Sequence, residues 1–503
     1  SCAEDDGAGY LRPVTPRLQV GHARSPHVML FRQHYDTSLA QASYLIGCQR
    51  SGEAIVVDPL RDVEPYVALA AREGVRIVAV TETHIHADYC SGTRELAART
   101  GARTYLSAEG GPDWRYAFAD ADDATLLRHG DTIRIGNVAL TALHTPGHTP
   151  EHLSFLVTDG AVTEQPMGIL TGDFVFVGDV GRPDLLERAA QVQDSMVEGA
   201  RTLWASLRAL DAHPDWLQLW PGHGAGSACG KALGAVPQST LGYERLVNWA
   251  FRCTSEAQFV NEVLAGQPEP PAYFARMKRI NRDGPPVLGG VTSPRRASPL
   301  EVHAWLHDGL HVLDVRNAAS YAARHLLGTI NIPLGRSFVT WAGALLDYDR
   351  DTLVLVPDDA AGDRVARELM TIGYDRVAAV ADADAALNGA ETDAIPQVSP
   401  VALMGALGTH AVHVLDVRGR REWDEGHLAG AVHIPLPELP DRLAEVPQHG
   451  TIVVQCAAGG RSAIAASVLR AAGRSRVENL AGGIQAWRAQ GLPIVVDAPV
   501  SMS

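Results

Sequence analysis

The sequence predicts an α/β protein of several domains, with one large N-terminal domain followed by two copies of a smaller module. The chain has 503 residues, and at roughly 150 residues per domain this length predicts about three domains. In the first half, short apolar runs alternate with helix-like segments. In the second half, a set of short motifs recurs at a nearly constant spacing.

The N-terminal region alternates strand-like and helix-like segments. Strand-like runs occupy residues 28–31, 54–57, 76–80 and 139–143, and helix-like segments occupy residues 64–73 and 194–210. The stretch 281–296 is dense in Pro, Gly and charge, which indicates a loop between domains. We therefore assign residues 25–285 to the first domain.

The internal repeat defines the other two domains. The motif VLDVR at 312–316 recurs 102 positions later at 414–418, and NIPL at 331–334 recurs as HIPL at the same spacing. Each copy has an apolar strand ending in Asp, a turn, another strand and a helix, a pattern typical of a mostly parallel sheet with helices on both faces. We assign residues 296–392 and 396–497 to these modules.

Composition excludes several classes of function. The formal charge of −15 repels phosphate backbones, and no basic stripe is present, so nucleic acid is not an expected partner. No stretch approaches the roughly 20 apolar residues of a membrane helix. The six cysteines lie far apart, and residues 1–9 are polar and acidic without the features of a secretory signal. We expect a cytoplasmic protein without membrane attachment.

Histidine and aspartate motifs follow four of the apolar runs. Residues 83–89 read THIHADY, 145–149 read TPGHT, 170–173 read LTGD and 220–224 read WPGHG. Side chains on irregular loops at strand ends can converge on one divalent ion, and imidazole and carboxylate are common ligands. The sequence therefore predicts a metal site.

In this order and spacing, the four motifs resemble the metallo-β-lactamase superfamily over about residues 28–265. The resemblance implies an αββα sandwich. Hydrolytic members such as glyoxalase II carry His-x-His-x-Asp-His, whose last two residues help to hold a second metal ion, but here the final position is Tyr89. A neutral phenol is a poor ligand, and a second ion would retain only Asp88, His223 and a bridging Asp173. We predict one metal ion.

The loop motifs also resemble the persulfide dioxygenase branch of that superfamily. The resemblance implies one Fe(II) per chain, held by His84, His148 and Asp173, and oxidation of a low-molecular-weight thiol persulfide by O₂ to sulfite. Four further side chains are expected to surround the metal through hydrogen bonds: His86, Asp88, Tyr89 and His223.

Two more residues are candidates for a substrate or persulfide site. Arg182, in the motif GRPD at 181–184, is either a substrate contact or part of a salt-bridged loop. Cys229 follows His223 by six positions and is either a thiol that carries a persulfide or a small buried residue.

A cysteine lies between a strand and a helix in the last module. Residues 456–462 read CAAGGRS after the apolar run 451–455, with a helix expected over 463–472. Backbone N–H groups of such a loop can cradle an anion at the positive end of the helix. We predict that Cys456 is a thiolate nucleophile and that Arg461 assists it. The expected cradle consists of Ala457, Ala458, Gly459 and Gly460.

These residues and the motifs LDVR at 415–418, GHLAGA at 426–431 and LAGGIQAW at 480–487 resemble the rhodanese family of sulfurtransferases. Related phosphatases use Cys-x5-Arg, whereas four residues separate Cys456 from Arg461, which leaves phosphatase activity as a minor alternative. In the first module, Pro357 occupies the position of the cysteine and carboxylates follow over 358–363. We predict that this module is catalytically silent and acts as a spacer or docking element.

Together, the motifs predict a bifunctional enzyme of sulfide metabolism whose domain order resembles fusions of persulfide dioxygenase with rhodanese. The expected partners are a thiol persulfide, O₂, and sulfite or thiosulfate, and we expect a homo-oligomer. Two alternatives stay open, a zinc thioester hydrolase of the glyoxalase II type fused to a sulfurtransferase, and a non-catalytic sulfur relay.

Overall fold

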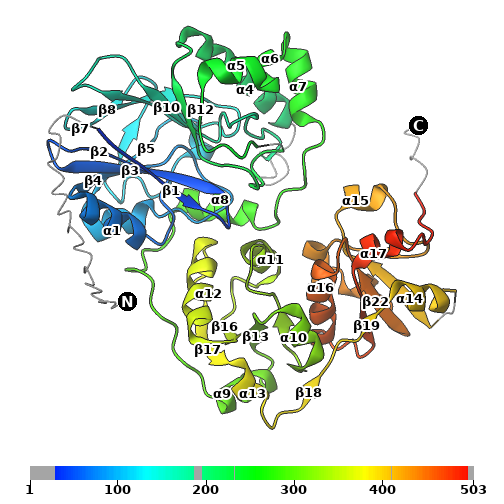
Figure 1. Cartoon of the computed structure of the whole chain (residues 1–503). Helices are drawn as coiled ribbons and strands as arrows, with labels where there is room; N and C mark the ends of the chain where they lie inside the picture. The colour runs from blue at the N-terminus through cyan, green and yellow to red at the C-terminus, as the bar shows by residue number, and fades with distance from the viewer. Residues whose placement is uncertain (1–28, 186–194, 232, 409–410, 497–503) are drawn as a thin grey trace, which may run out of the picture.

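The computed structural model of the chain describes residues 29–185, 195–231, 233–408 and 411–496. It shows one large α/β domain, drawn in blue to green, and two smaller α/β modules in yellow-green and in orange to red (Figure 1). The expectation for residues 1–9 and the starts of the segments predicted from residues 25, 28 and 194 lie outside the described residues.

The large domain contains two six-stranded sheets that pack face to face. In the first sheet the strands follow the chain order: β1 (Met29–Asp36), β2 (Gln41–Cys48), β3 (Glu53–Val57), β4 (Arg76–Thr81), β5 (Arg103–Ser107) and β6 (Thr125–Leu127). In the second sheet the order runs backwards from β12: β12 (Ser239–Thr240), β11 (Gln218–Pro221), β10 (Gly168–Gly172), β9 (Leu153–Asp159), β8 (Val138–His144) and β7 (Thr132–Ile135).

Helices cover the outer faces of both sheets. The helices of this domain are α1 (Glu64–Glu73), α2 (Thr93–Thr100), α4 (Ser195–Ala209), α5 (Leu241–Val247), α6 (Trp249–Arg252), α7 (Glu256–Leu264) and α8 (Phe274–Asp283). A buried cluster that includes Tyr44, Phe155 and Trp220 fills the space between the sheets. Separate clusters lie under α1 and α2 and under α4 and α7. This is the expected αββα sandwich.

Helix α8 corrects one prediction from the sequence. Residues 281–283 were expected in a loop, but α8 continues to Asp283 and ends at Gly284, whose φ of 96° suits a glycine at a helix end. The buried amide of Asn281 explains the difference. It accepts a hydrogen bond from the Ser91 backbone and donates to the carbonyls of His86 and Tyr89.

The first small module has a four-stranded parallel sheet in the order β15-β13-β16-β17, with helices on both sides. Its main elements are α9 (Pro299–His307), β13 (His311–Asp314), α10 (Ala318–Ala323), β15 (Ile330–Asn331), α11 (Phe338–Leu345), β16 (Thr352–Val356), α12 (Asp359–Thr371), β17 (Val377–Asp382) and α13 (Ala383–Leu387). The short strands β14 (His325–Leu326) and β18 (Thr392–Asp393) pair separately.

The second small module repeats this architecture with the strand order β19-β23-β22-β20-β21, again parallel. Its elements are β19 (Gln397–Val398), α14 (Pro400–Ala406), β20 (Val412–Asp416), α15 (Arg420–Asp424), β21 (Val432–His433), β22 (Thr451–Gln455), α16 (Gly460–Ala471), β23 (Val477–Leu480) and α17 (Gly483–Ala489). The internal repeat read from the sequence is therefore a repeat of structure.

The three parts are packed against one another. The Arg61 guanidinium, which is buried, pairs with Asp375 of the first small module at 2.7 Å. The Cys90 backbone N–H donates to the Thr371 carbonyl at 2.7 Å. The two small modules meet where Ser467 Oγ accepts from the Asn331 N–H. Among the described residues, no helix has the length and apolar character needed to cross a membrane.

Candidate functional site

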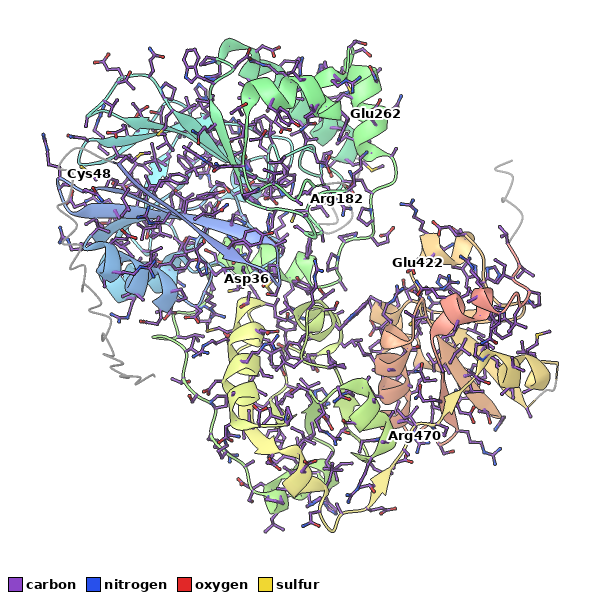
Figure 2. The ribbon with its side chains drawn as sticks, viewed as in Figure 1. Asp36, Cys48, Arg182, Glu262, Glu422 and Arg470 are labelled. Atoms are coloured by element: carbon purple, nitrogen blue, oxygen red, sulfur yellow. The ribbon has the colours of Figure 1, made fainter. Side chains whose placement is uncertain are left out.

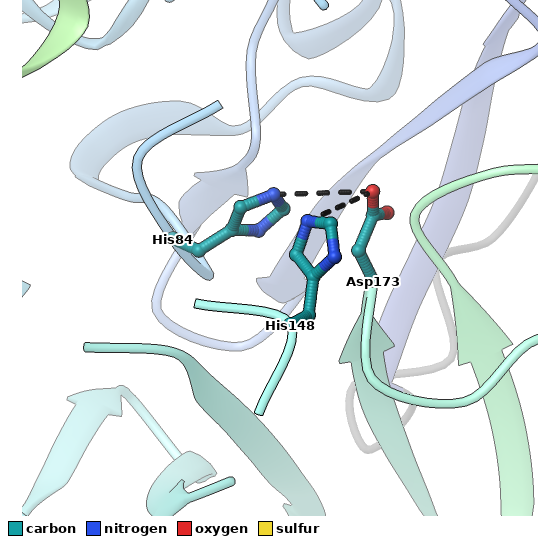
Figure 3. Close-up of side chains that lie close together, drawn as sticks. All are labelled: His84, His148 and Asp173. Atoms are coloured by element: carbon teal, nitrogen blue, oxygen red, sulfur yellow. Dashed lines mark ion pairs between the residues drawn. The ribbon is translucent and has the colours of Figure 1, made fainter. Parts of the chain in front are cut away.

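Three predicted metal ligands converge at the ends of strands from both sheets of the large domain. His84 follows β4, His148 follows β8 and Asp173 follows β10 directly. His84 Nε2 lies 3.9 Å from Asp173 Oδ2, and His148 Nε2 lies 3.6 Å from the same oxygen. Figure 3 shows both rings directed at this carboxylate. All three side chains are buried.

This geometry fits a metal ion. Nitrogen and oxygen ligands lie about 2.0–2.2 Å from a divalent ion, so two ligands of one ion are about 3–4 Å apart. The three ligand atoms lie within 4.8 Å of one another. Asp173 Oδ2 is buried and accepts no hydrogen bond, and a buried carboxylate oxygen without a partner is costly. An ion bound by these residues would supply the missing partner.

The charges at this site also suit metal binding. Burial lowers the pKa of His84 well below its usual range, and nearby histidines lower it further, which favours the neutral imidazole that binds metals. Burial alone would favour neutral Asp173, but His223 and His148 outweigh it and lower the pKa of this carboxyl.

Asp58 fixes the loop that carries His84, and the sequence reasoning missed it. Its Oδ1 accepts from the Thr83 N–H at 2.6 Å and contacts His86 Nε2 at 3.1 Å, while Oδ2 accepts from Thr83 Oγ1. The φ of Asp58 is 55°, an uncommon value for a residue other than glycine. Its position at the end of the apolar run 54–57 was an available signal.

Buried Glu151 links two ligand loops and was also missed. Its Oε1 accepts from the N–H of Ile85, which lies between His84 and His86. Burial raises the pKa of this carboxyl to about 7. Glu151 thus connects the loop after β8 to the loop after β4.

A second group of candidate ligands lies beside the first. Atoms of Asp88, His223 and Cys229 come within 4.8 Å of one another. Both ring nitrogens of His223 already face carboxylates, Nδ1 at 2.6 Å from Asp173 Oδ1 and Nε2 at 2.8 Å from Asp88 Oδ2. Burial opposes protonation of His223, but these two carboxylates raise its pKa well above the usual value.

Tyr89 occupies the position where hydrolytic relatives carry the last histidine. It is buried, and its hydroxyl lies 3.3 Å from the Gln41 amide and 3.4 Å from the Asp58 carbonyl. Its ring packs against His86. The phenol therefore supports the loop through hydrogen bonds and packing.

Arg182 lies in the interior of the large domain (Figure 2). Its Nε and Nη2 form a bidentate pair with Asp184, while Nη1 donates to the Ala228 carbonyl and Nη2 to the Pro268 carbonyl. These bonds hold the chain beside Cys229. The Cys229 thiol is buried, and burial with two nearby carboxylates raises its pKa well above the usual value.

The loop after β22 brings donors to the Cys456 sulfur. The Gly459 N–H lies 3.1 Å from Sγ, and Ser462 Oγ lies 3.3 Å from it. Gly459 has a φ of 99° and precedes α16, whose N-terminus points at the sulfur. The loop in the structure is shorter than the sequence predicts, because Gly460 and Arg461 already belong to α16. Ser462 was not singled out from the sequence.

Arg461 does not stand free beside the sulfur. Its guanidinium forms a bidentate pair with Glu422 of α15, at 2.6 and 2.7 Å. This carboxylate was also missed, because it lies 39 positions away in the chain.

The first small module has no such loop. Its helix α12 begins at Asp359, immediately after Asp358, whose carboxylate accepts the Ala361 N–H at 2.8 Å. The expected loop 358–363 is therefore mostly helix. The Asp358 carboxylate thus occupies the helix N-terminus that corresponds to the one beside Cys456 in the last module.

The fold and these sites define a class of protein, an αββα domain with a candidate metal centre followed by two modules of one repeated parallel α/β fold. Comparison with known families agrees with it. The model of the metallo-β-lactamase superfamily matches residues 36–223, and the model of the rhodanese-like domain matches residues 298–382 and 399–490.

A solved structure described as a metallo-β-lactamase from Staphylococcus aureus subsp. aureus COL is 43% identical, with a TM-score of 0.65, and the match covers 70% of this chain and 98% of that chain. The chain therefore belongs to the metallo-β-lactamase superfamily, and it continues into two rhodanese-like domains. The fold class and the family predicted from the sequence are confirmed.

Curated relatives include persulfide dioxygenases and hydroxyacylglutathione hydrolases. Persulfide dioxygenase ETHE1 of Mus musculus is 30% identical over 186 residues, which are 37% of this chain and 67% of the relative. The human form is 30% identical over 165 residues, 59% of its length. A hydroxyacylglutathione hydrolase of Rhodopseudomonas palustris is 27% identical over 258 residues, 50% of this chain and 87% of the relative.

Proposed function

We propose that the chain is a persulfide dioxygenase joined to a rhodanese-type sulfurtransferase. The observation that carries the first activity is the buried group of His84, His148 and Asp173, in which one carboxylate oxygen has no partner. Similarity to persulfide dioxygenases supports the substrate class. We keep 25–285, 296–392 and 396–497 as the proposed domain limits.

His84, His148 and Asp173 would hold one Fe(II). When bound, the iron would supply the redox chemistry by which O₂ oxidises a thiol persulfide to sulfite. Two histidines and one carboxylate leave positions open for substrate, as in other iron oxygenases with this ligand set.

The surrounding residues orient these ligands. Asp58 and Glu151 hold the loop of His84 from two sides through the backbone of Thr83 and Ile85. His223 supports Asp173 from the side opposite its partnerless oxygen. Such supporting hydrogen bonds set the direction of a ligand and are required for tight metal binding.

Two observations favour one metal ion over two. Tyr89 replaces the histidine that helps to hold a second ion in hydrolytic relatives, and its hydroxyl lies beside Gln41 and Asp58. Asp88 and His223, two of the remaining donors, are hydrogen-bonded to each other.

A thioester hydrolase is the second candidate, because the group Asp88, His223 and Cys229 could hold another ion and because one set of relatives is named hydroxyacylglutathione hydrolase. A second metal ion and release of a free thiol from a glutathione thioester would support it.

The second proposed activity is sulfur transfer through Cys456. The Sγ thiolate attacks the outer sulfur of a donor, an S–S bond forms on the enzyme, and the bond to the donor breaks with its electron pair on the leaving group. Sulfite would then take the outer sulfur, which forms thiosulfate and restores the thiolate. Sulfite from the metal site would thus be an acceptor for the persulfide on Cys456.

Oxygen uptake tests the first activity. The iron-loaded full chain should consume O₂ with glutathione persulfide and release sulfite, and His148→Ala should lose this activity by more than 100-fold. The matched control is His129→Ala. His129 is exposed and accepts a hydrogen bond from the His144 N–H, and its replacement should leave O₂ uptake at the wild-type rate. Absence of persulfide-dependent O₂ uptake by the wild type would refute the proposal.

Thiocyanate formation from a sulfur donor and cyanide tests the second activity. Cys456→Ser should abolish it, and Cys253→Ser, at another buried cysteine, should leave it intact. Retained transfer in Cys456→Ser would place the nucleophile elsewhere, while loss specific to this variant would exclude a relay without catalysis.

A further inference from the structure

The pair between Arg461 and Glu422 places a carboxylate beside the proposed sulfur-transfer site. The two Nη–Oε distances are 2.6 and 2.7 Å, and the side chains are 24% and 37% exposed. Figure 2 shows Glu422 on α15, in the last module. A paired guanidinium that stays partly open to solvent is accessible to an approaching donor.

The carboxylate is fixed on both sides. Glu422 Oε2 also accepts from the Gly419 N–H at 3.2 Å, at the start of α15. Arg461 belongs to the first turn of α16, whose N-terminus faces Cys456. The pairing hydrogen bond with Glu422 raises the pKa of Arg461, and the charge of Cys456 adds to this effect. Arg461 therefore lies in the same helical turn as Ser462, whose hydroxyl lies 3.3 Å from the sulfur.

The silent module provides an internal comparison. At the spacing of 102 residues, Glu422 corresponds to Ser320, and at the spacing of 99 residues between the two central strands, Arg461 corresponds to Gly362. The module without the cysteine thus lacks both members of the pair. By contrast, the buried pair Asp416–Arg418 recurs as Asp314–Arg316 with the same geometry. The Arg461–Glu422 pair occurs only in the module with the cysteine, whereas the Asp–Arg pair at 416 and 418 occurs in both modules.

Free guanidinium groups bind sulfonate-like oxygens through two parallel hydrogen bonds. In this site the carboxylate of Glu422 already takes both. A donor with two negative charges must approach or displace that carboxylate, whereas a donor with one charge meets less repulsion.

We propose that Glu422 is a specificity-determining residue that makes the Cys456 site prefer singly charged sulfane sulfur donors, such as a persulfide anion, over the dianion thiosulfate. This inference rests on the proposed sulfur transfer through Cys456. It fits an enzyme in which thiosulfate is a product of the site and a thiol persulfide is the donor.

The donors for the test differ by one charge. Thiosulfate reacts with the Cys456 thiolate to give the enzyme persulfide anion and sulfite, with a total charge of about −3 on each side by simple charge balance. The methanethiosulfonate anion, CH₃SO₂S⁻, gives the same persulfide and methanesulfinate, and the total charge is one unit smaller. In both reactions the S–S bond forms on Sγ, the donor's outer sulfur bond breaks, and cyanide then removes the sulfur as thiocyanate.

The readout is the ratio of kcat/KM for thiosulfate to kcat/KM for methanethiosulfonate, measured on the full chain. Glu422→Gln should raise this ratio about fivefold or more, because it removes one elementary charge from a partly solvated site. Glutamine can still accept the Gly419 N–H. Glu422→Ala should change the ratio in the same direction.

Glu425→Gln is the matched control. Glu425 follows α15 directly, is 61% exposed and pairs with Arg421 at 3.5 Å, so its replacement removes the same charge away from Arg461. An unchanged ratio in both Glu422 variants, or an equal rise in the Glu425 control, would overturn the inference. A wild type that transfers sulfur from neither donor would instead refute the transfer activity itself, and the inference with it.

Discussion

At the scale of single residues, the types and order of the chemical groups could be predicted from the sequence, but their partners could not. The motifs at strand ends predict His84, His148 and Asp173 as metal ligands, and the structure brings these three side chains together. Asp58 and Glu422 were missed, because each acts on a group that is distant in the chain. The position of an Asp or Glu in the sequence does not indicate which cation or backbone N–H its carboxylate will contact in the fold.

For Arg182, the structure favours a structural role over contact with the substrate. Its guanidinium is buried and donates to Asp184, Ala228 and Pro268, so a role in positioning the Cys229 segment is better supported than direct substrate contact. The sequence motif alone left both interpretations open.

Arg182→Met should therefore lower the free energy of unfolding by about 3–5 kcal/mol, the typical effect of breaking a buried ion pair. Chemical denaturation followed by circular dichroism measures it. Arg32→Met, which breaks the exposed pair with Glu73, is the control and should cost about 1 kcal/mol or less. Wild-type stability combined with a raised KM for persulfide would show instead that Arg182 contacts substrate.

At the scale of helices and strands, apolar periodicity located most elements, and the ends of helices were the weak point. The predicted helix over 64–73 matches α1. Helix α8 extends three residues into the expected loop because Asn281 bonds to the loop beneath it. Helix α12 begins earlier than expected because Asp358 caps it. Both deviations come from side-chain hydrogen bonds that periodicity does not report.

Gly459, directly before α16, can be replaced to test how the start of this helix supports Cys456. Its φ of 99° is unfavourable for other residues, and a left-handed conformation costs a side chain about 1–2 kcal/mol. Gly459→Ala should lower stability by that amount and also reduce sulfur transfer more than tenfold, because the N–H that faces Cys456 would turn away. Steady-state thiocyanate formation measures the second effect.

Gly473, at the other end of α16, is the control. Its φ is 84°, and an added Cβ would meet no atom within 4 Å. Gly473→Ala should cost similar stability without loss of transfer. Equal losses of activity in both variants would contradict a specific role for the Gly459 N–H.

At the scale of the whole molecule, the internal repeat and the change in composition were sufficient to predict three parts, but not their contacts. The first small module packs on the large domain through Arg61 and Asp375 and through the backbone hydrogen bond of Cys90. Sequence periodicity describes single elements, whereas such contacts join residues more than 250 positions apart.

Asp375→Ala tests this interface. It would leave the buried Arg61 charge without its carboxylate partner, and we expect stability to fall by about 2 kcal/mol, with faster proteolysis of the connecting segment 285–297. Asp351→Ala, which breaks the exposed pair with Arg376, should change neither. Identical proteolysis of both variants would show that the ion pair does not hold the modules together.

The proposed dioxygenase activity requires a single iron centre held by His84, His148 and Asp173. Elemental analysis of the full chain, purified without added metal and without oxygen, tests this directly. We predict one iron per chain in the wild type and its loss in His148→Ala. Two zinc ions per chain in active wild-type protein would contradict the single iron centre and favour the thioester hydrolase.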